Sequence, residues 1–248
     1  MMYDTAIAFE NLTVFYTPQG DKKKTIRLVH ADNLTILKGA CVALLGPSGS
    51  GKSTLLRAIN RLNECWEFLE TEGQVFLSLS GIQYALYPSV VPGSGKIPLD
   101  FLRQRVGMVF QHPQILPLTI AKNMLMPLTE GKGLSRKEAE EKMCWALTLS
   151  GLWDEVKDRL KSPAGRLSGG QMQRLCLART LALEPEILLL DEPTASLDMQ
   201  STELVEQTIT SLRKHMTIVL VTHSPEQANR LADRQFIVQN GVLLNPQL

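Results

Sequence analysis

A glycine-rich segment followed by lysine and serine is the strongest chemical signal in the chain. The P-loop pattern is matched by Gly46-Pro47-Ser48-Gly49-Ser50-Gly51-Lys52-Ser53, with Thr54 next. Glycines let successive backbone N–H groups face phosphate oxygens, and a helix starting at Lys52 would add partial positive charge there. Lys52 is expected to reach the β and γ phosphates of ATP, while Ser53 ligates Mg²⁺. The segment therefore predicts MgATP binding.

Acidic and imidazole side chains follow two apolar runs further along the chain. Asp191-Glu192 ends the run 187–190, and His223 comes two residues after the run 217–221. Such positions lie at the carboxyl edge of a parallel sheet, where open α/β folds bind ligands. We expect Asp191 to hold Mg²⁺ through water, Glu192 to polarise the attacking water and His223 to contact the γ-phosphate. An acidic turn after a core strand is common in any protein. The functional interpretation of Asp191-Glu192 therefore depends on the presence of the P-loop in the same chain.

The elements that must position these residues predict an α/β fold. Short apolar runs bounded by turn residues indicate buried parallel strands, with amphipathic helices such as 202–214 between them. Alternating apolar residues near the N-terminus indicate an antiparallel hairpin or meander that forms a β subdomain. The predicted parallel strands are 41–45, 106–110, 187–190 and 217–221, and the antiparallel segments are 7–9, 12–16, 26–29 and 34–37.

Two segments between the predicted strands differ from this pattern. Residues 84–98 are rich in Pro, Gly and Ser, which predicts a surface loop. Residues 113–167 lack clear strands and carry a helical segment, 135–150, that opens on Ser135 with Glu138 three positions later. That pair is a capping-box pattern, so we expect a helical subdomain inserted into the α/β core.

Composition narrows the partners and the compartment. The 248 residues have a formal net charge of +1, which gives no electrostatic reason to expect a nucleic acid. The four cysteines show no CxxC spacing and are interpreted as reduced core thiols: Cys41, Cys65, Cys144 and Cys176. No signal peptide or run of about 18 apolar residues is found. We expect a chain in the cytoplasm, without an appended regulatory domain after Gly241.

A further motif identifies a family. Leu167-Ser168-Gly169-Gly170-Gln171 closes the predicted helical subdomain and precedes a helix expected over 171–183. Together with the P-loop, Gln111, Asp191-Glu192, Asp198 and His223 in this order, it makes the chain resemble ATP-binding cassette transporter ATPases over essentially its whole length. The resemblance implies a single domain with a P-loop NTPase core and β subdomain (about 1–111 and 168–248) and an α-helical subdomain (112–167).

The resemblance also implies a dimer and further contacts with ATP. In this family the signature loop, here Ser168 to Gln171, lies on the γ-phosphate of the ATP bound by the partner subunit. A second copy of the chain is therefore expected in a head-to-tail arrangement with two composite sites. Tyr16 matches the aromatic residue that stacks on adenine, with Phe15 as the alternative. Asp198 resembles the aspartate that communicates across the dimer interface. Ala195 and Ser196 stand in the reverse of the order that is commonest in the family.

Gln111 resembles the glutamine that touches Mg²⁺ or the attacking water and links the core to the helical subdomain. His112-Pro113 beside it is expected to break the strand and permit a hinge. The family implies that a groove after Gln111 holds a helix of a transmembrane permease subunit. We expect the groove to be lined by Leu116, Pro117, Met124 and Met126, unless these residues fill the subdomain core instead.

Within the family, segments 56–63, 106–111 and 152–158 are similar to the ATPase subunit of bacterial phosphate importers. Three features depart from that pattern. Those subunits usually have proline where this chain has Met199, and the other two features are the long 84–98 segment and the segment 225–234. The resemblance implies a peripheral ATPase on the cytoplasmic face of the inner membrane that energises the import of phosphate or another small oxyanion. The implied partners are transmembrane permease subunits and an extracytoplasmic solute-binding protein.

The sequence leaves alternatives within the family open and disfavours two other classes of protein. An importer of a different solute and an export or lipid-extraction complex remain alternatives within the family. A cassette acting on ribosomes or DNA usually has two cassettes or a long coiled-coil insertion, and neither is present. A small-molecule P-loop kinase would need an acceptor pocket, for which no motif is found, and has no use for a signature loop.

Overall fold

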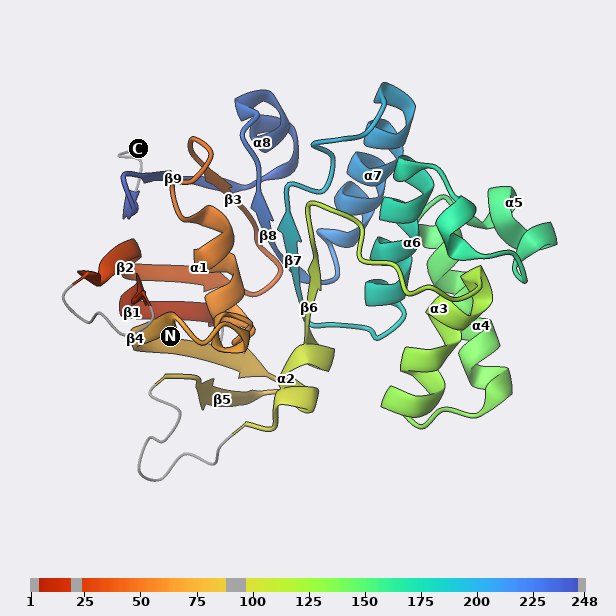
Figure 1. Cartoon of the computed structure of the whole chain (residues 1–248), viewed down its shortest axis with the longest axis horizontal. Coiled ribbons are helices and arrows are strands. Elements are labelled where there is room, and N and C mark those ends of the chain that lie inside the picture. The colour runs from red at the N-terminus through yellow and green to blue at the C-terminus, as the bar shows by residue number, and fades with distance from the viewer. Residues whose placement is uncertain (1–4, 19–23, 88–96, 245–248) are drawn as a thin grey trace.

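The computed structural model describes residues 5–18, 24–87 and 97–244. Within them, ten strands form one mixed sheet in the order β5-β4-β1-β2-β10-β9-β3-β8-β7-β6 (Figure 1). The strands are β1 (Thr5–Tyr16), β2 (Ile26–Leu37), β3 (Cys41–Leu45), β4 (Leu69–Leu79), β5 (Ile82–Ala85), β6 (Val106–Val109), β7 (Ile187–Asp191), β8 (Thr217–Val221), β9 (Arg234–Gln239) and β10 (Val242–Leu244).

Helices flank the sheet and extend from one end of it. They are α1 (Lys52–Ile59), α2 (Leu99–Arg105), α3 (Ile120–Met126), α4 (Arg136–Leu149), α5 (Trp153–Val156), α6 (Gly169–Leu181), α7 (Met199–Leu212) and α8 (Pro225–Leu231). Short helical turns are η2 (Asn63–Cys65), η3 (Pro127–Gly131), η4 (Lys157–Arg159) and η5 (Ala164–Arg166). In Figure 1, α1 lies over the sheet and α3 to α6 gather at the right.

The parallel half of the sheet contains the predicted strands. Strands β9, β3, β8, β7 and β6 run parallel, and every residue of β7 and β8 is buried. Continuous apolar runs such as Ile187–Leu190 are typical of strands covered on both faces, because no face is left for polar residues. The predicted α/β core is confirmed. The strand predicted over 106–110 is β6, which ends at Val109, one residue before the predicted end.

The antiparallel half differs in detail from the sequence prediction. Instead of four short segments, two strands of 12 residues each, β1 and β2, pair along their length. Asn11 has a positive φ of 50°, and the pairing of β1 with β4 shifts register between Glu10 and Thr13. The polar Asn11 therefore marks a β-bulge inside one strand and not a turn between two. Opposite it, Gly73 is needed, because a Cβ there would lie 2.1 Å from the Asn11 oxygen.

The two halves join through β10. Val242 pairs in parallel register with His30 of β2, while β10 itself pairs antiparallel with β9. One continuous hydrophobic cluster therefore includes residues of both halves, such as Phe9 of β1 and Phe236 of β9, together with Leu55 and Leu56 of α1. This shared core fixes the position of α1 relative to both kinds of strand.

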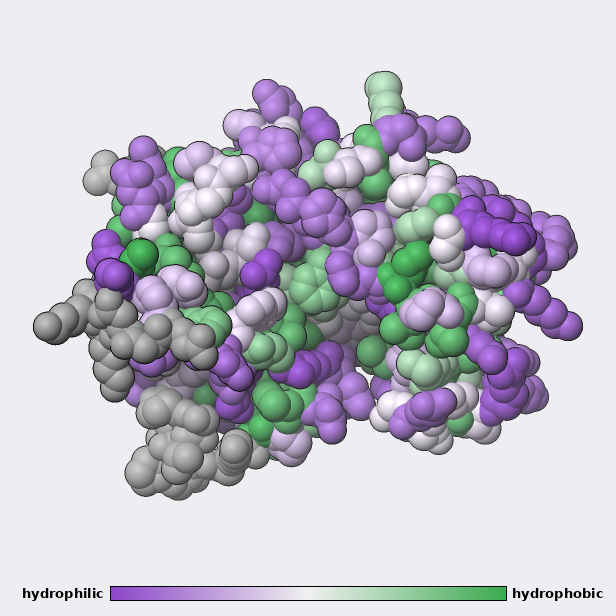
Figure 2. Space-filling model, viewed as in Figure 1, coloured by the Kyte–Doolittle hydropathy of each residue, from purple (hydrophilic) through white to green (hydrophobic). Residues whose placement is uncertain are grey.

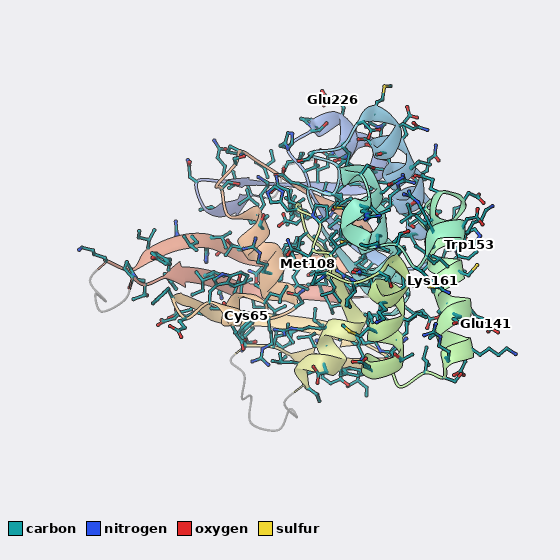
Figure 3. All side chains as sticks on the ribbon, turned by 45° about the vertical axis from the view of Figure 1, so that its right-hand side comes forward. Cys65, Met108, Glu141, Trp153, Lys161 and Glu226 are labelled. Carbon is teal, nitrogen blue, oxygen red and sulfur yellow. The ribbon has the colours of Figure 1, made fainter. Side chains whose placement is uncertain are left out.

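The segment between β6 and α6 is helical, and a second hydrophobic cluster holds it together. The cluster combines α3 and α4 with Leu175, Ala178 and Ala182, which lie in or just after α6. Ser135 and Glu138 form the predicted capping box at the start of α4. Figure 3 labels Glu141, Trp153 and Lys161 in this helical part, well away from Cys65 beside the antiparallel strands. The helical segment therefore shares its core with the signature helix α6.

The predicted surface loop 84–98 is only partly correct. Tyr84 and Ala85 belong to β5, and Leu86 and Tyr87 are buried, because β5 pairs with β4 and brings them against the core. Residues 88–96 lie outside the described residues. Among the cysteines, Cys41 and Cys176 are buried, Cys144 is half-buried and Cys65 is exposed, so the prediction of core thiols is wrong for Cys65.

Surface character varies across the molecule. On the face in Figure 2, hydrophobic residues gather over part of the helical segment and around α2, with hydrophilic residues toward the outer rim. Within the described part of the chain, no helix has the length and apolar character needed to cross a membrane.

Candidate nucleotide-binding and hydrolytic site

The carboxyl ends of four adjacent strands meet at one edge of the sheet. Asp191 of β7 pairs with Val221 of β8, which pairs in turn with Leu44 of β3. On the other side, Leu190 pairs with Val109, the last residue of β6. Loops leaving these strands begin side by side, so residues far apart in sequence are brought to one site.

The predicted P-loop connects β3 to α1 at this edge. Gly46 has a φ of 148° and a Cβ there would lie 2.1 Å from the Val238 oxygen, while Gly51 has a φ of 103° and a Cβ 2.8 Å from the Leu28 oxygen. Only glycine fits both constraints. The loop borders a cavity of about 290 Å³ that is lined by Leu28, Ser48, Gly49, Gly51, Lys52, Ser53, Thr54, Gln111 and Glu192.

The Lys52 ammonium lies inside the loop. Its Nζ donates to the carbonyl oxygens of Gly46 and Pro47, both at 2.9 Å, and the residue is 4% exposed. Both acceptors are neutral, so these hydrogen bonds do not neutralise the charge of the ammonium, which can still bind an anion. Ser50 Oγ is buried with no hydrogen-bond partner among the described residues. A cationic amine and an unpaired hydroxyl fit the phosphates of a nucleotide.

Ser53 and Asp191 form the candidate magnesium site. Ser53 Oγ donates to Asp191 Oδ1 at 2.7 Å, and Arg57 Nη2 lies 3.8 Å from Asp191 Oδ2. Burial raises the pKa of Asp191 above its ordinary value, against the opposing effects of Ser53 and Arg57. A nearby divalent cation would favour the charged carboxylate and offset this burial cost. Hydroxyl and carboxylate oxygens at this edge therefore fit Mg²⁺.

Glu192 is the point where three predicted residues meet. Its Oε2 lies 3.2 Å from His223 Nδ1 and accepts a hydrogen bond from Gln111 Nε2 at 3.4 Å. Glu192 also has a positive φ of 46°, an uncommon conformation for a residue with a side chain, and its N–H donates to the Val221 oxygen. The strained backbone turns the carboxylate toward the cavity that contains Lys52 and Ser53.

The signature residues and Asp198 lie in a different place. Ser168 and Asp198 border a second cavity, of about 310 Å³, that shares no lining residue with the P-loop cavity. Ser168 caps α6 through a capping box with Gln171, and the Gln171 amide donates to Glu155 at 2.6 Å. A Cβ on Gly170 would lie 2.2 Å from Ser201 Oγ, whereas one on Gly169 meets nothing within 4 Å.

Asp198 also has a structural role that the sequence analysis missed. Its side chain caps α7, accepting from the Ser201 N–H at 2.8 Å and from the Ser201 hydroxyl at 2.9 Å. These hydrogen bonds, the backbone one first, lower the pKa of Asp198. Asp followed three positions later by Ser before an apolar helix was the available signal. The cap brings Asp198 beside Gly170 and so joins the start of α7 to the start of α6.

Tyr16 and the expected groove residues stand apart from the P-loop cavity. Tyr16 ends β1 and its ring makes an edge-on contact with Phe68, leaving 37% of the residue exposed; Phe15 is half-buried. Pro117 is exposed, and Leu116 and Met126 are half-buried. Met124 is fully buried in the second hydrophobic cluster, so the expectation that it lines a groove is wrong and the core alternative holds there.

Three groups at the site escaped sequence reasoning. Leu28 reaches the P-loop cavity from β2, a strand with no motif. Arg57 approaches Asp191 and stacks over Trp66 at 5.3 Å. A hydrogen-bonded network of Gln227 with Thr194 and Glu206 lies beside the turn that follows Glu192. Pairings between separate elements leave no local pattern by which to find them.

The fold and this strand-edge site define a P-loop nucleotide-binding cassette. A family model described as ABC transporter matches residues 29–195. The chain belongs to the ABC transporter family, and it is an ATP-hydrolysing subunit of that family.

Known proteins similar to the chain are of the same kind. It is 41% identical over 238 residues to the phosphate import ATP-binding protein PstB of Borreliella afzelii (strain PKo), covering 96% of this chain and 85% of that protein. It is 42% identical over 235 residues to the phosphate import ATP-binding protein PstB 2 of Bacillus subtilis (strain 168), covering 95% and 81%. A solved ATP-binding cassette, dimeric and bound to ADP and Pi after hydrolysis, is similar with a TM-score of 0.76 and 29% identity over 96% of both chains.

Proposed function

We propose that this chain is the ATPase subunit of a phosphate importer. The observation that carries the choice of solute is the 41% identity, over nearly the whole chain, to a relative described as a phosphate import ATP-binding protein. Because an ATPase subunit does not itself select the solute, this support comes from relatedness and not from site chemistry. The geometry around the P-loop supports the hydrolytic activity.

Nucleotide binding is assigned to the P-loop. In our proposal Lys52 moves its ammonium from the Gly46 and Pro47 carbonyls to the β and γ phosphates of ATP, and loop N–H groups together with Ser50 and Thr54 complete the contact. Tyr16 presents its exposed ring to adenine. Ser53, Gln111 and Asp191 would hold Mg²⁺, which supplies charge neutralisation at the β and γ phosphate oxygens when bound.

Hydrolysis is assigned to the residues that meet at Glu192. The Glu192 carboxylate orients a water molecule and accepts its proton, while Gln111 contacts the same carboxylate or the water. The water oxygen forms a bond to the γ-phosphorus as the bond to the β–γ bridging oxygen breaks, giving ADP and phosphate. His223, 3.2 Å from Glu192, donates a hydrogen bond to the γ-phosphate.

A second copy of the chain completes each site in this proposal. Ser168, Gly169, Gly170 and Gln171 lie away from their own P-loop cavity, and the open surface over Gly169 permits close approach by another molecule. The head-to-tail dimer would place these residues on the partner's ATP, with Asp198 at the interface. Permease subunits, an extracytoplasmic solute-binding protein and a position on the cytoplasmic face of the inner membrane belong to the same proposal.

Domain motion would couple hydrolysis to transport. We assign residues 1–111 and 168–248 to the core and β subdomain and residues 112–167 to the helical subdomain. Gln111 stands at the junction, so engagement of its amide at the site would move the helical segment with α6, whose core it shares.

The test is purification of the chain with its native membrane complex in detergent. We expect two permease subunits to copurify and phosphate, with its solute-binding protein, to stimulate ATP hydrolysis in proteoliposomes. Glu192→Gln is the matched control, since it keeps the shape of the side chain and removes the base. Stimulation by a different solute would overturn the phosphate assignment. Hydrolysis at the parent rate by the variant would overturn the role of Glu192.

A further inference from the structure

The turn that follows β7 holds Glu192 in a conformation it would not adopt alone. Glu192 has a φ of 46°, and the N–H of Ala195 donates to its carbonyl oxygen at 3.2 Å. Pro193 and Thr194 form the middle of this turn. Because a positive φ is strained for a residue with a Cβ, neighbouring contacts must stabilise it.

One buried amide supplies such a contact from another element. Gln227 of α8 is 5% exposed, and its Nε2 donates both to Thr194 Oγ1 at 2.8 Å and to Glu206 Oε1 at 2.9 Å. The two N–H bonds of one NH₂ group are therefore both used. Thr194 is two residues after Glu192, so the amide fastens the turn that carries the carboxylate.

Gln227 is itself fixed in two ways. Its backbone N–H donates to Ser224 Oγ, the N-cap of α8, at 3.2 Å. The acceptor Glu206 is held on α7 by Arg230, whose Nη2 lies 2.8 Å from Oε1 and 3.1 Å from Oε2. Figure 3 labels Glu226 on α8, the helix that lies beside α7. A charged pair therefore fixes Glu206, one of the two acceptors of the Gln227 amide.

The same helix follows directly after His223. Ser224 separates His223 from α8, and Thr222 Oγ1 accepts from the Ser224 N–H at 3.1 Å. A displacement of α8 would thus move His223, and a displacement of Thr194 would move Glu192. Gln227 joins the two loops, and together with Glu192 and His223 it lines a cavity of about 210 Å³.

We propose that Gln227 is a positioning residue for hydrolysis: its amide, held by Glu206 and Arg230, sets the separation of Glu192 and His223 through Thr194. This inference rests on the proposed roles of Glu192 and His223. It assigns a function to a residue that lines no part of the P-loop cavity. Small errors in the position of reacting groups are costly, since a misplacement of about 1 Å can lower a rate by about 10²-fold.

The experiment compares Gln227→Met, Thr194→Val and the double variant with the parent in the purified full-length chain. Methionine fills a similar volume without donating, so the packing around the side chain is disturbed little. For each single variant we expect kcat for ATP hydrolysis to fall by about 10- to 100-fold while the ATP dissociation constant stays within about twofold. If Gln227 acts through Thr194, the double variant will be no slower than the slower single variant.

Gln207→Glu and Gln227→Glu form a matched pair. Gln207 is exposed on α7, so its change to glutamate will leave kcat unaltered. Gln227→Glu places a carboxylate against Glu206 and will lower kcat as strongly as Gln227→Met. Thermal unfolding of every variant separates a loss of fold from a loss of position, and Thr194→Val, at a half-buried site, tests the proposal even if Gln227 variants unfold.

The outcomes separate this inference from the proposed function. A parent chain that does not hydrolyse ATP, or a Glu192→Gln variant as fast as the parent, would contradict the proposed function. An active parent and an inactive Glu192→Gln variant, combined with normal kcat in folded Gln227→Met and Thr194→Val, would overturn the positioning role alone. Rate losses that multiply in the double variant would also overturn it.

Discussion

The imidazole Nδ1 of His223 lies 3.2 Å from Oε2 of Glu192, although the residues are 31 positions apart in the chain. His223 leaves 62% of its side chain exposed, while Glu192 exposes 13%. The recessed carboxylate lines the P-loop cavity, and the exposed ring lies against it. In our proposal this contact joins the base to the donor that binds the transferred phosphate.

Replacement of His223 by alanine should slow hydrolysis and spare binding. We expect kcat to fall by about 10²- to 10³-fold, because a donor to developing charge is lost. Since Lys52 and the P-loop remain, ATP affinity should change little. Steady-state ATPase assays and a nucleotide titration measure the two quantities, and a fall in affinity with unchanged kcat would contradict the assignment.

Two neighbouring glycines should respond differently to alanine. A Cβ on Gly170 would lie 2.2 Å from Ser201 Oγ, so Gly170→Ala should destabilise the chain by about 1–3 kcal/mol. A Cβ on Gly169 meets nothing, and alanine in the first turn of α6 should leave stability unchanged or raise it by up to about 1 kcal/mol. Urea unfolding of both variants compares the two sites directly.

The same glycine pair tests the proposed dimer. If the open surface at Gly169 faces a partner's ATP, Gly169→Ala should lower ATPase activity while the monomer stays fully stable. Full activity in Gly169→Ala would remove this surface from the site. An equal loss of stability in both variants would contradict the packing of α6 against α7.

Met199 can be changed to proline without harm to the fold. It is the first residue of α7, where the backbone N–H has no partner in the helix, and it is 80% exposed. Asp198 before it is already extended, with φ −66° and ψ 165°, as proline requires of its predecessor. We expect Met199→Pro to raise stability by about 0.4–1 kcal/mol in thermal unfolding.

A proline three positions later is the control for Met199→Pro. The Thr202 N–H donates to the Asp198 oxygen at 2.9 Å. Thr202→Pro should therefore lose this bond and cost about 3 kcal/mol. A similar cost for Met199→Pro would show that α7 begins elsewhere.

Glu184 should contribute stability that depends on pH. Its carboxylate contacts Lys142 at 2.5 Å and Lys132 at 3.3 Å, and the hydrogen bond from Lys142 is the main cause that lowers its pKa below the ordinary 4.5. A lowered pKa in the folded chain means that the stabilisation is present above pH 4.5 and is lost as pH falls through the folded value.

We expect Glu184→Gln to cost up to about 1 kcal/mol at neutral pH, because the carboxylate is half-exposed and solvent screens the pairs. The cost should vanish once the parent carboxylate is protonated. Urea unfolding of the parent and the variant across this range measures the difference, with the exposed Glu203→Gln as control. A difference that grows as pH falls would contradict the sign.

Local features of the site were predictable from the sequence. The P-loop reads as a strand, a glycine turn and a helix within a few residues, and the ends of β7 and β8 were visible as apolar runs followed by polar residues. The Ser135 capping box was predictable for the same reason, since it depends on residues three apart. The cap that Asp198 makes with Ser201 had an equally local signal. The sequence analysis gave Asp198 only the role implied by the family resemblance and did not predict this cap.

Features that depend on packing were not predictable. The predicted segments 7–9 and 12–16 are separate, but pairing with β4 carries one strand through Asn11 as a bulge. Met124 looked suited to an adaptable groove, yet α4 and α6 bury it. Gln227 has no motif, because its meaning lies in Thr194 and Glu206, which come from other elements.

The sequence by itself determined the class of protein, the residue types at each strand end and the position of the P-loop. These depend on residue types at short spacing, where the backbone geometry is nearly fixed. Only the tertiary structure decided that His223 and Gln111 meet at one carboxylate oxygen of Glu192. It also decided that Ser168 lies at a different cavity from the P-loop of the same chain. Distances between separate elements follow from the register of the sheet and the packing of the core, and no local pattern encodes them.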